Sequence, residues 1–141
     1  MPHKRHRPHN VRDQHAERNI RSDMCSVVDS GGRLFVRGQV GYTVHATDRK
    51  LVGPGDPAAQ ADQAMNNVRQ LLEEVGARLQ EICKVKIWVT DRTFLEPVMN
   101  VVGRHLKGIP VAYTLVIVDG LARAEMLVEI DVDVVRSARG A

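Results

Sequence analysis

The chain has 141 residues, 43% of them hydrophobic, so its length and composition indicate one globular domain rather than a disordered segment. Its net charge of +3 is uneven, because residues 1–21 contain six basic and two acidic side chains, which leaves the other 120 residues at −1. No apolar run is long enough for a bilayer and no signal-peptide pattern follows Met1, so we expect no membrane association and a cytoplasmic location.

The cysteine content excludes two further classes of protein. Cys25 and Cys83 lie far apart and form no Cys-x-x-Cys pair, which argues against a disulfide framework and against a zinc site. We therefore expect reduced thiols, no metal and no cofactor.

Residues 1–21 are the basic part of the chain and carry neither helical nor strand periodicity. They hold four histidines, His3, His6, His9 and His15, among arginines and two prolines. We expect a flexible, solvated tail. Two alternatives remain open: an arm that contacts nucleic acid or another anionic surface, and metal capture by histidines at three-residue spacing. Since this basic cluster has no aromatic side chain to contact bases, we do not expect nucleic acid as a partner.

Residues 24–29 and 33–41 are predicted to form a hairpin around Ser30-Gly31-Gly32, because glycines supply the positive φ of a tight turn. Alternation in the second strand predicts two faces, one with Leu34, Val36, Gly38 and Val40 and the other with Phe35, Arg37 and Gln39. Residues 43–56 have the glycine and proline content of a loop.

A helix is predicted from Asp56-Pro57 to a stop at Gly76. Its apolar residues recur at spacings of three and four, which predicts a stripe that packs on a sheet. The pair Asn66-Asn67 lies on this helix, and we expect an asparagine here to bond a loop carbonyl rather than a ligand.

The second half of the chain predicts a strand at Val85–Thr90, a helix at Thr93–Leu106, and two strands near residues 112–118 and 126–135. The last strand alternates, with Glu129, Asp131 and Asp133 on its polar side. The order predicts an α+β fold with both helices on one sheet face. The strand around Leu115 is apolar on both sides, and two helices cannot cover both. Oligomerisation best explains that uncovered surface.

Several spaced blocks resemble the RidA (YjgF) family of enamine and imine deaminases. In chain order they are Leu34 to Gly41, Gln63 to Val68 with Gly76-Ala77, Lys84 to Asp91 with Phe94 and Asn100, Ile109 to Leu121, and Val128 to Ile130. The resemblance covers residues 22–136 and implies a RidA-like (chorismate mutase-like) domain between the tail of residues 1–21 and a short tail of residues 137–141. It also implies a homotrimer whose sheets surround a central barrel, with clefts between subunits.

The resemblance further implies which positions surround a ligand. The family binds a small 2-imino acid, holds its carboxylate with an arginine at the start of the strand after the second helix, and positions water with a glutamate of the last strand. Tyr113 occupies that arginine position here, Met24 occupies that of a tyrosine in the first strand, and the glutamate is kept as Glu129. A neutral tyrosine has no charged fork for a carboxylate.

Arg37 occupies a position at which the family usually has a small residue in the cleft, often serine. We hypothesise that its guanidinium pairs with Glu129 in the empty state, or clamps an anionic ligand against Tyr113. The catalytic candidates are therefore Glu129 and Tyr113, and the candidate ligand contacts are Arg37, Gly38, Met24, Asn100 and Leu115.

Two functions follow from these departures. The first is a divergent deaminase or hydrolase for a small imine, enamine or related metabolite. The second is a trimer that binds or senses a small metabolite and has lost the deaminase activity. For both functions we expect an anionic ligand. The familiar catalytic motifs, such as a phosphate-binding glycine loop or Gly-x-Ser-x-Gly, are absent from the chain.

Overall fold

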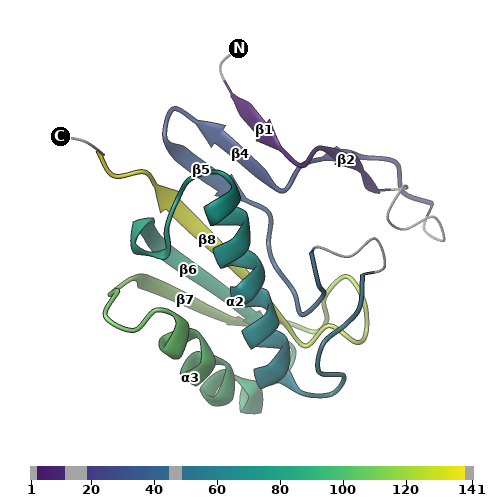
Figure 1. The fold of residues 1–141 in the computed structure, drawn as a ribbon. Helices are drawn as coiled ribbons and strands as arrows, with labels where there is room; N and C mark the ends of the chain where they lie inside the picture. The colour runs from purple at the N-terminus through teal and green to yellow at the C-terminus, as the bar shows by residue number, and fades with distance from the viewer. Residues whose placement is uncertain (1–2, 12–18, 45–48, 139–141) are drawn as a thin grey trace.

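The computed structural model describes residues 3–11, 19–44 and 49–138. Its elements are β1 (Lys4–His6), β2 (His9–Asn10), β3 (Asp23–Met24), β4 (Val27–Ser30), β5 (Arg33–Val36), α2 (Pro57–Glu74), η1 (Leu79–Glu81), β6 (Ile82–Val89), η2 (Arg92–Phe94), α3 (Leu95–His105), β7 (Ala112–Ile117) and β8 (Val128–Val135). Strands β1, β4, β5, β8, β6 and β7 form one sheet in that spatial order, and β2 pairs with β3. Both helices lie on one face of the large sheet (Figure 1). The predicted α+β architecture is therefore confirmed.

The hydrophobic core lies between the two helices and the facing side of the sheet. On β6 this side carries Val85, Ile87 and Val89, all fully buried, and on β8 it carries Val128, Ile130, Val132 and Val134. Each aliphatic side chain removed from water in this way contributes roughly 1.5–3 kcal/mol. The alternation predicted for the last strand is thus the alternation of a half-buried strand, and its carboxylates lie on the open face.

The start and the end predicted for the first helix are confirmed. Asp56 is the N-cap and accepts a hydrogen bond from the backbone N–H of Ala59 at 3.1 Å, and Pro57 is the first helical residue. At the other end Gly76 adopts φ +74°, which a side chain with a Cβ disfavours.

Two buried amides of α2 hold the loops at the end of the sheet. Asn67 donates to the carbonyl of Val40 at 3.2 Å and to that of Tyr42 at 2.6 Å, as expected for a structural asparagine. Gln60 donates to the carbonyl of Glu125 and accepts from the N–H of Leu127. Because these bonds are shielded from water, they fix the loops firmly against the helix.

A β-bulge follows β5 and corrects the predicted alternation. Phe35 pairs with Asp133, and Gln39 pairs with Ile130. Between these two pairs the segment after β5 advances four residues, whereas β8 advances three. The extra residue moves Gln39 to the buried side, where it is only 5% exposed, rather than to the side of Phe35. Arg37 lies inside this bulge, where the ladder is interrupted.

The segment of residues 3–11 also differs from the expected tail without regular structure. Strand β1 pairs antiparallel with β4, and β2 pairs antiparallel with β3. These strands have three and two residues and are polar, so no periodicity marks them; they form because the hairpin leaves the edge of β4 free to pair. Residues 12–18, with His15, lie outside the described residues.

Strand β7 is the far edge of the sheet and is exposed along most of its length. Tyr113 is 37% exposed, Leu115 42% and Ile117 38%. The covering expected for this strand is therefore not supplied by the chain itself. The open face of the sheet also exposes Phe35 and Val135.

Neither helix of the described residues has the length and apolar character needed to cross a membrane. Cys25 and Cys83 are free cysteines, the first half-buried and the second exposed.

Candidate functional site

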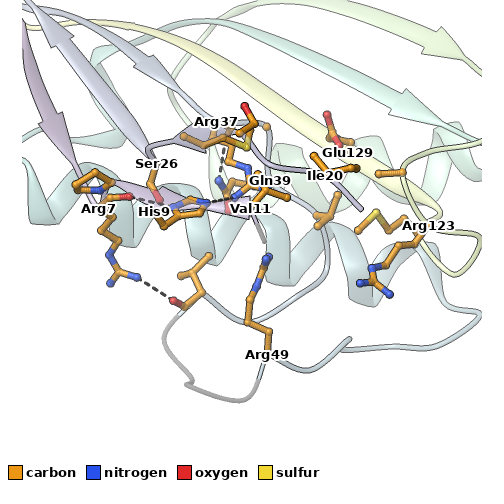
Figure 2. A pocket seen from close by; sticks show the side chains of 18 residues that line it. Arg7, His9, Val11, Ile20, Ser26, Arg37, Gln39, Arg49, Arg123 and Glu129 are labelled. Atoms are coloured by element: carbon orange, nitrogen blue, oxygen red, sulfur yellow. Dashed lines mark hydrogen bonds between the residues drawn. The ribbon is translucent and has the colours of Figure 1, made fainter. Parts of the chain in front are cut away.

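A cavity of about 620 Å3 lies where the bulge, the start of β8 and the N-terminal segment meet. The residues that line it come from five parts of the chain: Arg7, Pro8, His9 and Val11; Ile20, Ser22, Met24 and Ser26; Arg37, Gly38, Gln39 and Val40; Val44 and Arg49; and Ala122, Arg123, Met126 and Glu129. Figure 2 shows these stretches turning their side chains toward one another. The bulge and the loops held by α2 thus bring together residues that are far apart in the sequence.

Glu129 is the acidic side chain of this lining within the described residues. It lies at the start of β8 on the open face, opposite Trp88 of β6. Burial raises the pKa of its carboxyl, the neighbouring Asp131 raises it further, and Arg37 opposes both. A carboxyl with a raised pKa returns a proton more readily than an ordinary glutamate does.

Gly38 makes room for that carboxylate. A Cβ at this position would lie 2.6 Å from Oε2 of Glu129, closer than such atoms can approach. The glycine backbone is in an ordinary region, since its φ is not positive. Glycine at position 38 therefore keeps the Glu129 carboxylate in its place by leaving it space, and not through backbone freedom.

Arg37 lies beside Glu129 in the cavity, but the ion pair hypothesised between them is not among the contacts of the described residues. Its Nη1 instead donates to Nε2 of His9 at 3.1 Å. Burial lowers the pKa of the guanidinium, and the nearby charge of Glu129 raises it. The charges of Arg37 and Glu129 therefore affect each other's pKa although no hydrogen bond joins the two side chains.

The predicted site residues divide into two groups. Met24, Arg37, Gly38 and Glu129 all line the cavity. The others lie elsewhere in the chain: Asn100 is exposed on α3, and Tyr113 and Leu115 are exposed on β7.

Tyr113 and Glu129 of the same chain lie on opposite faces of the sheet. Tyr113 is opposite Val85, on the side that faces the helices, whereas Glu129 is opposite Trp88, on the open side. Partial burial raises the pKa of the Tyr113 phenol. Arg37 and Tyr113 of one chain therefore do not share this cavity, and a clamp between them stays a prediction about two neighbouring copies.

Sequence reasoning missed several basic residues of the cavity, namely Arg7, His9, Arg49 and Arg123. The pKa of Arg49 is lowered first by burial and then by the charges of Arg37 and Arg123. A pKa perturbed by burial and by neighbouring charges is typical of a functional site. Arg7 and His9 lie in the predicted tail, where nothing in the sequence pattern placed them near β8.

Within the described residues no group of three or more histidine, cysteine or carboxylate side chains is arranged to hold a metal ion. Of the tail histidines in that part of the chain, His6 bonds Glu74 and His9 bonds Arg37.

The sequence matches known proteins along most of its length. A family model described as endoribonuclease L-PSP matches residues 20–136. Protein DfrA of Myxococcus xanthus is 33% identical over 104 residues, which cover 74% of this chain and 76% of that protein. A RutC family protein of Aquifex aeolicus is 29% identical over 108 residues, which cover 77% of this chain and 82% of that protein.

Solved structures show the same fold. A member of the YjgF/YER057c/UK114 family from Mycobacterium tuberculosis superposes with a TM-score of 0.76 at 22% identity, covering 95% of this chain and 99% of that one. A member of the Rid protein family from Yersinia pestis superposes with a TM-score of 0.73 at 26% identity, covering 80% of this chain and 87% of that one. The chain thus belongs to the RidA (YjgF) family, whose family model is described as endoribonuclease L-PSP.

Proposed function

We propose that the cavity binds a small anionic imine or enamine and hydrolyses its C=N bond. The observation that carries this proposal is the lining itself: Arg37 and Glu129 line one cavity, and Gly38 leaves the Glu129 carboxylate its place there. Arg37 fixes the carboxylate of the ligand, and Glu129 holds the attacking water. This assigns to Arg37 the anchoring role for which the family uses an arginine at the position of Tyr113.

The reaction needs one water and no oxidant. The substrate is a protonated 2-imino acid. Water adds to its C=N carbon while Glu129 takes a proton from that water, and the product of this step is a tetrahedral carbinolamine. Glu129 then returns that proton to the amine nitrogen, the C–N bond breaks, and ammonia leaves with the electron pair. Loss of the hydroxyl proton gives the 2-oxo acid, and ammonia carries the proton away as ammonium.

The electrostatics of the cavity suit both steps. A carboxyl with a raised pKa returns a proton to a leaving group more readily than an ordinary glutamate. Arg37, Arg49 and Arg123 surround the space, so a negatively charged ligand is favoured over a neutral one. Orientation of the C=N carbon against a held water supplies much of the acceleration.

A second candidate function is binding without catalysis. It is favoured by Tyr113, which replaces the family's carboxylate clamp and lies on the other sheet face from Glu129 of its own chain. In that case the protein is a metabolite-binding trimer whose cavity keeps its shape and has lost turnover.

We also propose a homotrimer, which both functions share. The exposed apolar side chains of β7, with Leu115 at 42% and Ile117 at 38%, would then pack against neighbouring copies. Sedimentation velocity should give three times the 15.7 kDa of one chain. A mass of one chain at micromolar concentration would contradict the assembly.

The loss of freshly generated 2-iminobutanoate tests the catalytic function. Arg37→Ala should lower kcat/KM at least about tenfold, because a charge-assisted hydrogen bond to the ligand is lost. Arg33→Ala is the matched control: Arg33 lies on the adjoining strand over the ring of Phe35 and outside the cavity, so the rate should stay within twofold of wild type.

Two results of this assay decide between the functions. Equal rates for wild type and Arg37→Ala, both above the uncatalysed rate, would remove Arg37 from the site. A wild type that only matches the uncatalysed rate, together with a Tyr113→Arg variant that exceeds it, would support binding without catalysis.

A further inference from the structure

The N-terminal segment, residues 3–11, lies outside the stretch that the family model matches, which begins at residue 20. It nevertheless forms one wall of the cavity through Arg7, Pro8, His9 and Val11. Val11 is only 8% exposed, and β1 extends the large sheet beyond β4. This segment is therefore a built part of the cavity.

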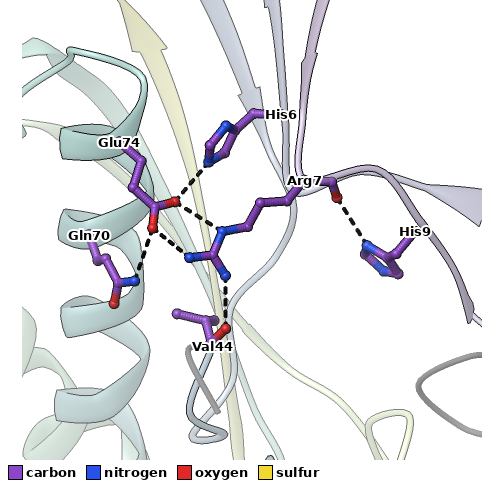
Figure 3. Close-up of polar contacts among 6 residues, drawn as sticks. All are labelled: His6, Arg7, His9, Val44, Gln70 and Glu74. Carbon is purple, nitrogen blue, oxygen red and sulfur yellow. Dashed lines mark hydrogen bonds and ion pairs between the residues drawn. The ribbon is translucent and has the colours of Figure 1, made fainter. Parts of the chain in front are cut away.

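A cluster of polar contacts fixes the segment to α2, and we call it the latch (Figure 3). Glu74 accepts from Nε of Arg7 at 3.0 Å, from Nη2 of Arg7 at 2.5 Å and from His6 at 2.7 Å. The third nitrogen of Arg7 donates to the carbonyl of Val44 at 2.8 Å. Partial burial raises the pKa of the Glu74 carboxyl, but the hydrogen bonds from Arg7 and His6 outweigh it and lower the pKa to about 2.

The latch sets the backbone from which His9 projects. Arg7 adopts φ +52°, an uncommon value for a residue with a side chain, and its guanidinium is held at both ends. Its carbonyl then accepts from Nδ1 of His9 at 3.1 Å. His9 is thus oriented by the residue that the latch immobilises.

The hydrogen bonds assign the tautomer of His9. A guanidinium can only donate, so Nε2 of His9 must be the acceptor for Arg37. Nδ1 then carries the proton and donates to the carbonyl of Arg7. A doubly protonated imidazole would have no acceptor for Arg37 and would put two cations 3.1 Å apart.

We infer that His9 is a positioning residue for the anion site: in its neutral form, held by the latch, it orients the Arg37 guanidinium toward the ligand. This inference rests on the proposed function of Arg37 as the anchor of an anionic ligand. It gives the segment outside the family match a defined role in affinity, and it makes that affinity depend on the protonation of one histidine.

The pH dependence has a definite sign. Protonation of His9 would remove the acceptor that holds Arg37, so it releases the guanidinium and weakens anion binding. The charged groups on the elements around His9 are Arg7, Arg37, Arg49, Asp23 and Glu129. Protonation of Glu129 would remove a negative charge from the cavity and strengthen anion binding, and protonation of His6 would strengthen the latch. Weaker binding at low pH therefore points to His9.

Calorimetric titration of the full chain with 2-oxobutanoate, the stable 2-oxo acid product, tests this role. His9→Ala should weaken binding about tenfold at pH 8, since the hydrogen bond to a charged group is lost. His9→Gln can offer an amide oxygen near the place of Nε2, and it should restore most of the affinity. Wild-type affinity should fall about tenfold between about pH 8 and pH 5, and the glutamine variant should show no such fall.

Two further variants control for loosening of the segment. Asn10→Ala removes the neighbouring side-chain bond to Asp23 without touching Arg37, and it should bind like wild type. Glu74→Gln should weaken the binding of 2-oxobutanoate. His9→Ala should then lower the affinity less in the Glu74→Gln protein than in wild type, because both substitutions act through the hydrogen bond between His9 and Arg37.

The outcomes separate this inference from the proposed function. If Arg37→Ala abolishes 2-oxobutanoate binding while His9→Ala binds like wild type at every pH, the role of His9 is overturned and Arg37 remains the anchor. If Arg37→Ala binds like wild type, the proposed anchor itself is wrong. An equal pH-dependent fall in wild type and His9→Gln would also overturn the role of His9.

Discussion

Glu129→Gln is expected to lower kcat for imine hydrolysis by about 10²-fold or more, the range of a lost general base. The amide keeps the shape of the side chain and its place beside Gly38, but it can neither take a proton from water nor return one to the amine. KM should change little, because the Arg37 anchor is untouched. Steady-state kinetics with 2-iminobutanoate measures both constants.

Asp131→Asn is the matched control for this variant. Asp131 lies two residues further along β8 on the same open face, and burial followed by the charge of Asp133 raises its pKa, although Lys86 opposes them. It does not line the cavity and affects the reaction only through the pKa of Glu129, so Asp131→Asn should lower the rate much less than Glu129→Gln. Equal losses in both variants would mean that open-face charge matters in general and that Glu129 has no special role.

The pH profile of the wild-type rate supplies a second check on Glu129. The step that activates water needs the carboxylate form, and burial raises the pKa at which that form is lost. The rate should therefore fall as pH drops through this raised pKa, starting at a higher pH than for an ordinary glutamate. A rate independent of pH across the acid range would contradict the assignment.

Gly38→Ala is expected to lower kcat/KM by up to about 10²-fold with almost no change in stability. The added methyl would lie 2.6 Å from Oε2 of Glu129, so the carboxylate must move away from its place in the cavity. The carboxylate is the far end of a flexible side chain, and the backbone φ at Gly38 is not positive, so the fold can accept the methyl. Kinetics together with thermal unfolding distinguish the two effects.

Gly103→Ala is the control for the glycine substitution itself. Gly103 lies inside α3, and a Cβ there would meet nothing within 4 Å. Alanine should leave kcat/KM unchanged and stabilise the helix by roughly 0.5–1 kcal/mol. If Gly38→Ala has the activity of wild type, the position of the Glu129 carboxylate does not matter to the reaction.

The catalytic candidates illustrate how far sequence reasoning reached at the site. Met24, Arg37, Gly38 and Glu129 were all expected at the ligand, and all four line the cavity. Met24, Gly38 and Glu129 were predicted from positions that the family motifs mark. Arg37 was predicted because it occupies a position at which the family usually has a small residue in the cleft. Tyr113 was also predicted from its position in a motif, but which sheet face it occupies depends on the parallel pairing of β7 with β6.

His9 and Arg7 could not be predicted in the same way. His9 begins the short polar strand β2, and Arg7 lies between β1 and β2. The partners of these strands lie 13 to 25 residues further along the chain, from Asn10 with Asp23 to Lys4 with Asp29, and such short polar strands leave no periodic signal. The contacts of these two residues to Glu74 and Arg37 span 67 and 28 residues along the chain. Only packing of the finished sheet against α2 brings these groups together.

The sequence by itself determined the elements whose signals are local. Asp56-Pro57 and Gly76 delimit α2, the Gly31-Gly32 pair makes the hairpin, and the alternation from Val128 to Val134 separates a buried face from a carboxylate face. Each signal arises from the backbone preferences or the solvation of neighbouring residues, so it survives without tertiary context.

The tertiary structure alone decided which of these elements share a cavity. The bulge at Arg37 inserts one residue into the pairing of β5 with β8, and this extra residue aims the guanidinium at the site and moves Gln39 into the core. The segment of residues 3–11 then closes the cavity by pairing with an edge that exists only once the hairpin has formed. Register and edge pairing are properties of two chain segments together, which no single stretch of sequence encodes.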